Sequence, residues 1–487
     1  MSDWFLPQTE RNWSSGNLVT PRVHGAEYFR RLVDVVRATR TGDEISFTDW
    51  RGDPDEALTV DGPTVGELFC DAVRRGVRVR ALLWRSHSDK TSFSAQENQH
   101  LGVQVNAAGG EALLDQRVRR GGSHHQKMAV VRHAGRPQDD VAFVGGIDLC
   151  HSRRDDHDHR GDPQPQPMDH RYGPRPPWHD VMLEIAGPAV TDVLGTFVQR
   201  WDDPTPLDHR NPVRRAQQRR AGMPRHPERI GTTGPPPPAA GDHAVQVLRT
   251  YAAKRPPFPF APRGERSIAH AYERAFARAR RLVYLEDQYL WSVPVVQALA
   301  DALRRTPALQ LIAVVPRFPD SDGRFTGPGN RLGQLAAMRL LAEAGGDRVG
   351  VYDLENEVGT PIYVHAKVCV VDDAWMSCGS DNVNRRSWTH DSELTCAVVD
   401  PDGDLPRQLR TRLWGEHLRL PPDDPRLQDL DGANALWRER AATTASRARV
   451  HRPAPVGPVA RLWAHPLQRL LFDPDGRPAP LRLRRRF

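Results

Sequence analysis

The sequence contains few cysteines. Only five occur among its 487 residues: Cys70, Cys150, Cys369, Cys378 and Cys396. The number is odd and most of them lie in apolar runs, which argues against a disulfide framework and against a zinc module built from paired cysteines. We therefore expect five buried free thiols.

A secretion signal and long apolar runs are also missing. Residues 1–10 contain no basic segment followed by an apolar one. No uninterrupted run approaches the roughly 20 apolar residues that a membrane-spanning helix requires. We therefore expect a cytoplasmic protein that is at most peripheral to a membrane.

Acidic residues are fewer than basic ones. The chain has 68 Lys and Arg against 61 Asp and Glu, a formal net charge of +7. This excess favours anionic partners such as phosphodiesters, nucleic acids or acidic lipid surfaces, although a generally basic composition is the alternative explanation. No zinc-finger, basic-zipper or RNA-recognition pattern is present, so we expect no sequence-specific nucleic-acid module.

The order of predicted elements repeats in the two halves of the chain. Apolar patterns in the first half predict strands over residues 44–50, 77–84, 102–106, 123–132, 141–146 and 181–185 and a helix over 190–201. The second half is predicted to hold the same series, with strands over 282–288, 309–316, 349–353, 363–372, 376–380 and 394–399 and a helix over 407–417. A chain of this length has room for two cores, and the repetition indicates a duplicated α/β unit.

Composition suggests where the units end. Residues 202–242 are rich in Arg, Pro, Gln and Gly, which is typical of a linker, and they separate a first lobe over 1–201 from a second over 243–420. Residues 421–487 form a basic extension rich in Arg and Pro. We expect its apolar segment, residues 459–472, to dock on the body of the protein, with contact between the basic tail and a membrane surface as the alternative.

A histidine and a lysine stand two residues apart in the most distinctive segment of the second half. Residues 363–372 read Tyr-Val-His-Ala-Lys-Val-Cys-Val-Val-Asp, which gives the spacing H-x-K-x4-D with His365, Lys367 and Asp372. Side chains two apart on a strand project from the same face, so this imidazole and this ammonium group are predicted to point together.

A weaker copy of that segment occurs in the first half. Residues 123–132 contain His125 and Lys127 at the same spacing, but Arg132 stands where the aspartate should be. A phosphodiester reaction needs a nucleophile for phosphorus, a proton donor for the leaving oxygen and cations over the non-bridging oxygens. Two facing copies supply all three without a metal, so the pair predicts phosphodiester chemistry where one copy alone would be a chance match.

The last position of the motif is predicted to be structural. Asp372 follows His365 by an odd number of residues, so on a regular strand it faces away from the histidine and the lysine. We expect it to serve packing or loop anchoring. Arg132 is accordingly interpreted as a tolerated change in the scaffold, and loss of catalysis in the first half is the alternative.

These residues resemble the phospholipase D superfamily, which is marked by a duplicated H-x-K-x4-D motif. The resemblance covers most of residues 20–420. Further stretches that look like this family are Gly145-Gly-Ile-Asp-Leu-Cys150 with Arg153 and Asp155, Trp178-His-Asp-Val181, Glu286-Asp-Gln-Tyr289, Gly379-Ser-Asp-Asn382 and Asn384-Arg-Arg-Ser387 with Glu393. The resemblance implies an α/β fold of two similar lobes, each a mixed β-sheet flanked by helices, related by a pseudo-twofold axis with one active site at their interface.

The resemblance also implies roles for the motif residues. His125 would attack phosphorus to form a phosphohistidine, while His365 would protonate the leaving alcohol and then activate water or an acceptor alcohol. The reverse order, with His365 as nucleophile, is the alternative. Lys127 and Lys367 would hold the equatorial oxygens of the phosphoryl group.

Supporting residues follow from the same resemblance. Asp155 is expected behind His125 and Glu393 behind His365, each carboxylate orienting an imidazole. Solvated or structural carboxylates are the alternative for both. Residues expected to be catalytic or to contact substrate are Asn382, Ser380, Gly146, Gln288 and His179.

A metal site is the alternative interpretation of one polar segment. His157 and His159, with Asp155 and Asp156, lie in a His-, Asp- and Pro-rich insertion over residues 155–178. Ligands in a loop without a fixed fourth partner make a poor metal site, so we expect a solvated surface loop, no metal and no cofactor.

The sequence thus predicts a phosphodiesterase of the phospholipase D type that hydrolyses or transfers phosphatidyl groups. The reaction class follows from the paired histidines, whereas the phospholipid substrate follows from the resemblance alone. A metal-independent nuclease or another non-lipid phosphodiesterase is one alternative. A non-catalytic protein that binds anionic membranes or nucleic acid is the other. Head-group preference, hydrolysis against transfer and oligomeric state are not encoded in these patterns.

Overall fold

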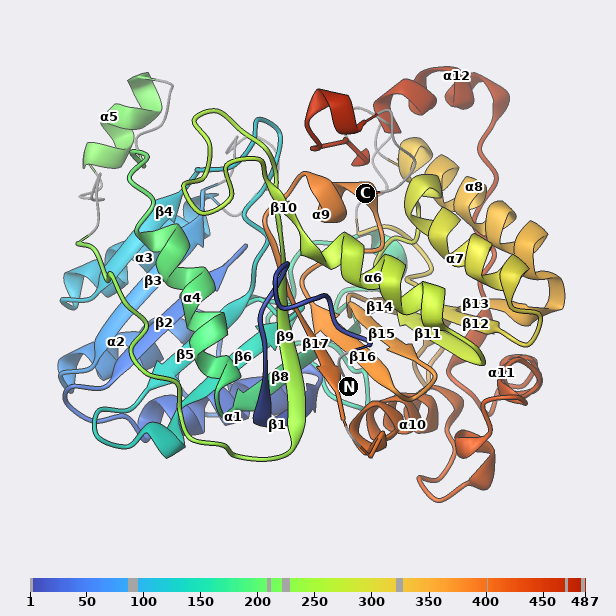
Figure 1. Cartoon of the computed structure of the whole chain (residues 1–487), viewed down its shortest axis with the longest axis horizontal. Coiled ribbons are helices and arrows are strands. Elements are labelled where there is room, and N and C mark those ends of the chain that lie inside the picture. The colour runs from blue at the N-terminus through green and yellow to red at the C-terminus, as the bar shows by residue number, and fades with distance from the viewer. Residues whose placement is uncertain are drawn as a thin grey trace.

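The computed structural model of the chain contains two mixed β-sheets that lie side by side, with helices on their outer faces (Figure 1). It describes residues 3–85, 95–207, 212–220, 228–320, 327–400, 402–468, 472–482 and 487. None of the helices within these ranges is both long and apolar enough to span a bilayer.

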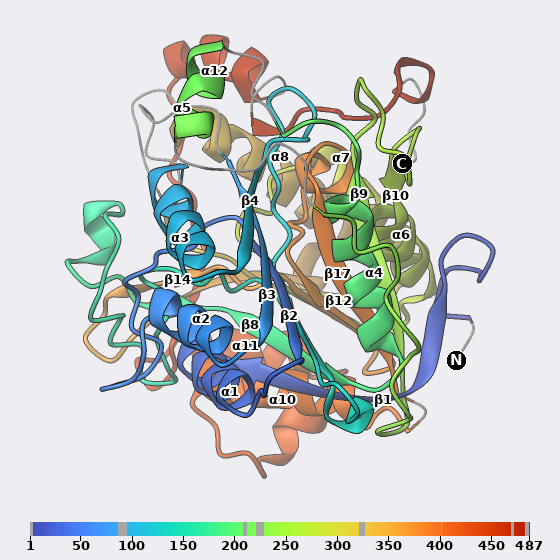
Figure 2. The same cartoon turned by 90° about the vertical axis from the view of Figure 1, so that its left-hand side faces the viewer.

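The N-terminal lobe is built around a seven-stranded sheet. Its elements are β1 (Trp13–Val23), α1 (Gly25–Arg37), β2 (Glu44–Asp49), α2 (Val65–Arg74), β3 (Arg78–Trp84), α3 (Ala95–Ala107), β4 (Glu111–Asp115), β5 (Met128–Arg132), β6 (Val141–Gly145), β7 (Trp178–His179), β8 (Val181–Ala186) and α4 (Ala189–Trp201). The strand order is β4-β3-β2-β5-β6-β8-β1, in which β4, β3 and β2 are parallel and the remaining neighbours antiparallel. Helices α1, α2 and α3 lie on one side of this sheet and α4 on the other (Figure 2).

The C-terminal lobe repeats this plan. Helix α5 (Pro212–Arg220) precedes it, and its elements are β9 (His243–Tyr251), β10 (Glu265–Arg266), α6 (Ser267–Arg278), β11 (Leu282–Glu286), α7 (Val293–Arg305), β12 (Gln310–Val314), α8 (Gly327–Gly345), β13 (Val349–Glu355), β14 (Pro361–Val364), β15 (Val368–Val371), β16 (Trp375–Gly379), α9 (Arg385–Thr389), β17 (Glu393–Val399) and α10 (Asp404–Leu418). The extension adds α11 (Ala433–Ala441), β18 (Ala448–Val450) and α12 (Pro458–Leu467). The strand order β13-β12-β11-β15-β16-β17-β9 matches the first sheet strand for strand. The prediction of two similar lobes with mixed sheets is confirmed.

Strand β1 belongs to both sheets. Its first part pairs with β9, as in Trp13 opposite Gln246, and its last part pairs with β8, as in Val23 opposite Val181. The backbone hydrogen bonds of one strand therefore connect the two lobes.

Alternation along the strands explains how the lobes pack. In β5, Val130 belongs to a core cluster between the sheets, whereas Ala129 and Val131 belong to a cluster under the outer helices. The equivalent strand β15 alternates in the same way, with Val370 facing the shared core. Because both faces of these strands are covered, they read as continuous apolar runs in the sequence.

Three local predictions need correction. Residues 102–106, predicted as a strand, lie in α3, because Leu101 and Val105 are spaced as on one helix face and are buried while Val103 is 40% exposed. The H-x-K segments do not lie inside regular strands; each ends just before β5 or β15. The insertion after residue 155 is not a solvated loop throughout, because His159 is fully buried. The expectation for cysteine is confirmed, because all five are free and buried.

Candidate active site

The two H-x-K segments lie where each lobe contacts the other. The backbone N–H of His125 donates to the carbonyl of Ser392 at 2.9 Å, and the N–H of His365 donates to the carbonyl of His179 at 2.8 Å. Both acceptors belong to the opposite lobe, and each directly precedes an acidic residue, Glu393 or Asp180. The arrangement therefore delivers one carboxylate from each lobe to the histidine of the other.

The side chains complete this exchange between lobes. Nδ1 of His125 lies 2.9 Å from Oε2 of Glu393, and Nδ1 of His365 lies 2.6 Å from Oδ2 of Asp180. An imidazole held through Nδ1 by a carboxylate presents Nε2 for chemistry in a fixed orientation. Each ring also lies near a tryptophan. The ring centroids of His125 and Trp50 are 6.4 Å apart, and those of His365 and Trp178 are 4.9 Å apart.

The expected assignment of carboxylates is wrong. Asp155 does not contact His125; it accepts hydrogen bonds from the backbone N–H groups of Trp178 at 2.7 Å and Gly161 at 3.0 Å. Glu393 orients His125 and not His365. Proximity in the sequence suggested that each histidine takes a carboxylate from its own lobe. The packing of the lobes instead brings the carboxylate of the other lobe to each histidine.

The two motif lysines are buried beside the histidines. Nζ of Lys127 donates to the carbonyl of His125 at 3.0 Å and lies 3.5 Å from Oδ1 of Asp148. Nζ of Lys367 donates to the carbonyl of His365 and, at 3.3 Å, to Oε1 of Gln288. Burial, with the charge of Lys127, lowers the pKa of Lys367 to about 8.

Burial and positive charge also act on the two imidazoles. Burial first, and then the charges of Lys127 and Lys367, hold the pKa of His125 well below its usual value. His365 responds in the same way, with burial the largest cause and Lys367 the next. Each ring is affected by the lysine of the other lobe, which indicates that the two motifs form one site. Neutral imidazole is the form that a nucleophile requires.

The carboxylate behind His125 has an unusual environment. Glu393 is fully buried, and burial together with the charge of Asp391 raises its pKa to about 8. Its Oε2 atom accepts a hydrogen bond of 2.5 Å from the hydroxyl of Ser380. A buried carboxyl group with a raised pKa therefore lies directly behind the imidazole of His125.

This hydrogen bond changes the interpretation of Ser380. The side chain is fully buried, and its hydroxyl oxygen also accepts the N–H of Leu394 at 3.0 Å. Ser380 was expected to contact substrate, but its hydroxyl is engaged by Glu393. Its contribution is to position that carboxylate.

Gly146 also acts through a carboxylate. A Cβ atom at this position would lie 2.1 Å from Oδ1 of Asp180, so a side chain cannot be accommodated without moving the group that holds His365. The expectation that Gly146 contacts substrate is therefore replaced by a steric role. Gln288, also expected at the substrate, bridges Lys367 and the hydroxyl of Tyr363, to which its Nε2 donates at 2.7 Å.

A cleft of about 380 Å³ opens over His125. Residues from both lobes line it: Trp50, Trp84, Gly121, Gly122, Ser123, His125, Tyr289, Trp291, Asn382, Asn384, Arg386, Ser387, Asp391, Glu393 and Phe472. Asn382 is buried and its Oδ1 atom has no hydrogen-bond partner among the described residues. The aromatic wall of the cleft consists of Trp50, Trp84, Tyr289, Trp291 and Phe472. The cleft thus combines an imidazole and an amide with this aromatic wall, which suits a ligand that has both a charged and an apolar part.

His179, which the sequence predicts to contact substrate, does not line the cleft over His125. Its side chain is fully buried, and Nε2 lies 2.7 Å from Oε2 of Glu286. The next residue, Asp180, reaches the site instead. Adjacent residues on a strand point to opposite faces, so one of the two had to face away from His365.

Asp372 and Arg132 both lie at the ends of their strands, away from the histidines. The carboxylate of Asp372 accepts the backbone N–H groups of Arg280, Arg281 and Leu282 at 2.7–2.8 Å. It thereby anchors the turn that enters β11.

The first lobe achieves the same connection from the opposite side. Asp43, which directly precedes β2, accepts the backbone N–H of Ala134 at 2.8 Å, beyond the end of β5. Arg132 instead lies 2.7 Å from Asp140 and donates to the carbonyls of Thr233 and Pro235 at 3.2 and 2.9 Å. The anchoring carboxylate of the first lobe, Asp43, thus stands before β2, whereas that of the second lobe, Asp372, follows β15. Arg132 binds the segment that connects the lobes.

Sequence reasoning did not identify the aromatic wall or the pairing of Asp180 with His365. Trp50 directly follows β2 and Trp84 ends β3. These are neighbouring parallel strands, so the proximity of the two tryptophans to one another was available from the strand order. Their position over His125 depends on the contact between lobes.

Two family models match the chain. One, described as phospholipase D, matches residues 53–295, and the other, described as cardiolipin synthase, PLD-like domain, matches residues 272–414. The first range contains His125 and Lys127, and the second contains His365 and Lys367.

Similar curated proteins include three phospholipases D. The chain is 27% identical to phospholipase D beta 2 of Arabidopsis thaliana, over 74% of this chain and 52% of that protein. It is 24% identical to phospholipase D alpha 4 of the same organism, over 82% and 65%. It is 26% identical to phospholipase D A of Dictyostelium discoideum, over 62% and 27%. The chain thus spans between 27% and 65% of the length of these relatives.

A solved structure shares the fold. Phosphatidylserine synthase of Haemophilus influenzae Rd KW20 superposes with a TM-score of 0.55 over 90% of this chain and 98% of that one, at 14% identity. The similarity is one of architecture. With both motifs inside matching family models and the two-lobed fold in common, the chain belongs to the phospholipase D superfamily.

Proposed function

We propose that this protein is a phospholipase D-type phosphodiesterase that hydrolyses or transfers the phosphatidyl group of phospholipids. The observation that carries the proposal is the crossed pair of His125 with Glu393 and His365 with Asp180, at 2.9 and 2.6 Å. Two imidazoles, each oriented by a buried carboxylate and accompanied by a buried lysine, supply a nucleophile and a proton donor at one site.

The first step forms a bond between His125 and phosphorus. Neutral Nε2 of His125 attacks the phosphodiester in line with the leaving alcohol. As the P–O bond breaks, the leaving oxygen takes the proton on Nε2 of His365, and Nδ1 of His365 takes the proton of Asp180, a carboxyl group whose pKa is raised by burial. Glu393 stabilises the positive charge that develops on His125. The ammonium groups of Lys127 and Lys367 stabilise the non-bridging oxygens.

In the second step the proton is transferred in the opposite direction, to His365. Nε2 of His365, which now carries no proton, takes one from water or from an acceptor alcohol, and Nδ1 returns its proton to Asp180. The oxygen of that water or alcohol attacks phosphorus and displaces His125. Water yields a phosphatidic acid, and an alcohol yields a new phosphodiester. Asn382, at the cleft beside His125, is placed to donate its amide N–H to a phosphoryl oxygen.

The aromatic wall of the cleft favours a lipid-linked substrate over a nucleic acid backbone, in agreement with the phospholipase D relatives. We further propose that the enzyme works at a membrane surface from the cytoplasm. The basic extension that begins after residue 420 is a candidate for contact with acidic head groups.

The decisive assay supplies labelled phosphatidylcholine in mixed micelles with and without ethanol. Release of phosphatidic acid, and of phosphatidylethanol when ethanol is present, is the expected result. His125→Ala and His365→Ala should each abolish both products. Plasmid DNA serves as the competing substrate, and nicking of DNA without lipid turnover would contradict the proposal.

A further inference from the structure

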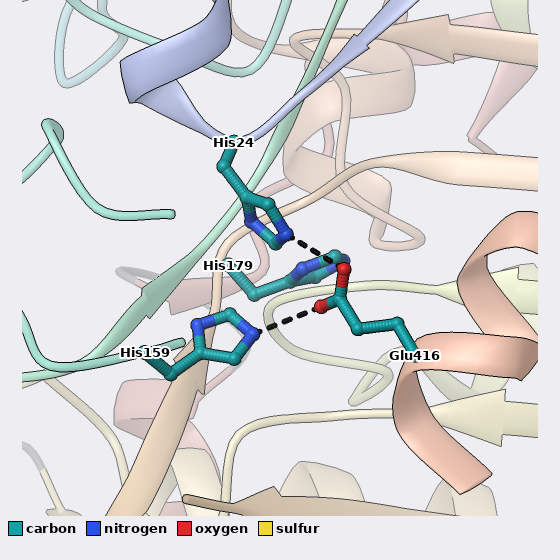
Figure 3. Close-up of side chains that lie close together, drawn as sticks. All are labelled: His24, His159, His179 and Glu416. Atoms are coloured by element: carbon teal, nitrogen blue, oxygen red, sulfur yellow. Dashed lines mark hydrogen bonds and ion pairs between the residues drawn. The ribbon is translucent and has the colours of Figure 1, made fainter. Parts of the chain in front are cut away.

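Four side chains that are far apart in the sequence meet in a buried cluster between the lobes (Figure 3). They are His24 before α1, His159 in the insertion, His179 in β7 and Glu416 in α10. One nitrogen or oxygen from each lies within 4.8 Å of the others. The cluster joins three residues of the N-terminal lobe to one of the C-terminal lobe.

The carboxylate lies between two of the imidazoles. Oε2 of Glu416 is 2.9 Å from Nε2 of His24, and Oε1 is 3.0 Å from Nε2 of His159. All three histidines are almost completely buried, with exposures of 3%, 0% and 0% in chain order. Ligand atoms around a tetrahedral zinc ion lie about 3.3 Å apart, as its bond lengths of roughly 2.0–2.2 Å require. The two distances from Glu416 are slightly shorter, and the other separations in the cluster are within 4.8 Å.

Further carboxylates lie behind two of these rings. Oδ2 of Asp155 is 3.6 Å from Nδ1 of His159, the nitrogen that faces away from Glu416. This is an ion-pair distance and not a hydrogen bond. Oε2 of Glu286 is 2.7 Å from Nε2 of His179. A carboxylate on the outer nitrogen is the usual support of a metal-binding histidine, because it fixes both the tautomer and the direction of the ring.

A network of hydrogen bonds between lobes is the alternative explanation, but it leaves polar atoms unsatisfied. Nδ1 of His179 is buried without a hydrogen-bond partner among the described residues, as are the Nδ1 atoms of His24 and His159, which face away from Glu416. A buried polar atom without a partner costs about 1–3 kcal/mol. Because Nε2 of His179 is engaged by Glu286, its Nδ1 is the nitrogen available to a ligand.

The backbone is held in an uncommon conformation at two of these positions. His24 has a φ of 71° and His159 a φ of 54°, in the left-handed region that residues other than glycine seldom adopt. Such conformations persist where the surroundings hold the residue in place. Here both place an imidazole against Glu416.

We propose that His24, His159, His179 and Glu416 bind one divalent transition-metal ion, with Zn²⁺ as the best match. Three imidazoles and one carboxylate are a donor set that suits Zn²⁺, and four protein ligands close a tetrahedral site and leave no position for substrate. The ion is therefore structural and ties α10 to the N-terminal lobe.

The site also bears on the proposed reaction, and this consequence rests on the proposed function. His179 directly precedes Asp180, and the carbonyl of His179 accepts the backbone N–H of His365. A metal ion on His179 would fix the segment that orients the acid–base histidine. Loss of the ion should lower the rate of lipid turnover as well as the stability of the fold.

The primary test is the metal content of full-length protein purified without a histidine tag. We expect about one equivalent of zinc per chain by elemental analysis. Removal of the ion by a strong chelator should lower the thermal midpoint, and addition of Zn²⁺ should restore it. Substitution with Co²⁺ should give the intense visible absorption of a tetrahedral site.

Two substitutions and a control test the assignment. Glu416→Gln should abolish stoichiometric zinc, and Asp155→Asn should weaken zinc affinity by about 10- to 100-fold, as loss of an outer carboxylate does. His451→Gln changes a buried histidine that is held by Asp353 elsewhere and should retain the metal. If Glu416→Gln fails to fold, Asp155→Asn and the reconstitution of wild-type protein still decide the matter.

The proposal is overturned if wild-type protein contains no stoichiometric metal and if Zn²⁺, Co²⁺ and Mn²⁺ leave the thermal midpoint unchanged after chelation. Metal content and thermal midpoint are measured without any substrate. A protein that holds zinc but does not turn over phosphatidylcholine would retain this site and contradict the proposed function, so the two failures are distinguishable.

Discussion

The imidazole of His125 in the N-terminal lobe is held at 2.9 Å by the carboxylate of Glu393 in the C-terminal lobe, 268 positions later in the chain. The reciprocal pair, His365 with Asp180, spans 185 positions. Neither motif histidine takes its carboxylate from its own lobe. Catalysis by the proposed mechanism therefore requires both lobes in contact.

Removal of one crossed carboxylate should impair turnover without unfolding the protein. In Glu393→Gln the amide cannot stabilise a positive charge on His125, so kcat should fall by about 10²- to 10⁴-fold with little change in KM. Glu184→Gln is the matched control, because Glu184 pairs with Arg22 and Arg31 away from the cleft. Equal losses in the two variants would show that the crossed pairing has no special role.

The basic limit of the pH profile should report Lys367. Its pKa is lowered to about 8, so its ammonium group loses its charge as the pH rises through 8 and no longer stabilises the phosphoryl oxygens. We expect kcat/KM to decline above about pH 8. Lys367→Arg, which stays charged, should move this decline beyond pH 9 even at a reduced rate.

Lys254 provides the control for that experiment. Burial lowers its pKa to about 8 as well, but Lys254 does not line the cleft over His125. The profile of Lys254→Met should match that of the wild type. If the decline near pH 8 disappears in Lys254→Met and persists in Lys367→Arg, then Lys254 and not Lys367 sets the basic limit, and the prediction is wrong.

The acidic limit should lie lower than an ordinary histidine would give. The nucleophile must be neutral, and burial with two nearby lysines holds the pKa of His125 well below its usual value of 6.5. Protonation therefore removes activity only as the pH falls through that lowered value. In Glu393→Gln, which has no carboxyl group to titrate in this range, we expect kcat/KM to stay level from pH 7 down through pH 6.5, and a half-loss at pH 6.5 would contradict the assignment.

Gly146→Ala should act on the site through Asp180. The added methyl group would meet Oδ1 of Asp180 at 2.1 Å and displace it from His365. A misplacement of about 1 Å in such a group costs roughly 10²-fold in rate. Gly457→Ala has no atom within 4 Å of the new methyl group and should leave activity unchanged. Steady-state kinetics of the two variants provide the comparison.

Restoration of the full motif in the first lobe should not improve the enzyme. Arg132→Asp would place a second carboxylate beside Asp140, which Arg132 now pairs with at 2.7 Å, and would remove the hydrogen bonds to Thr233 and Pro235. Loss of hydrogen bonds from a charged group costs about 1.5–3 kcal/mol each at most, so we expect a clear fall in the free energy of unfolding. Denaturant titration measures this fall, and kcat should change by less than twofold. An increase in kcat would show that the arginine impairs catalysis.

Much of the architecture follows from local pattern. Apolar periodicity located the strands on which His125 and His365 depend, and the repeated order of elements indicated two equivalent lobes. The H-x-K spacing placed each lysine beside its histidine. These features depend on residues that are close in the sequence, where the geometry of a strand determines which side chains share a face.

Periodicity misled at places where a residue's partner is remote. Val103 and Val105 alternate like a strand, but the helix that contains them packs Leu101 and Val105 against the neighbouring sheet and leaves Val103 exposed. Asp155 was expected at His125 because it follows the first motif closely. The structure instead places it behind His159, in a cluster that includes Glu416 from the other lobe.

The sequence by itself determined the chemical groups of the site, the duplicated fold and the pairing of histidine with lysine in each motif. Only the tertiary structure decided which carboxylate orients which histidine and brought His24, His159, His179 and Glu416 together. The reason is physical. Backbone geometry fixes the direction of neighbouring side chains, whereas contacts between lobes depend on how two complete apolar faces pack, and no short segment of the chain carries that information.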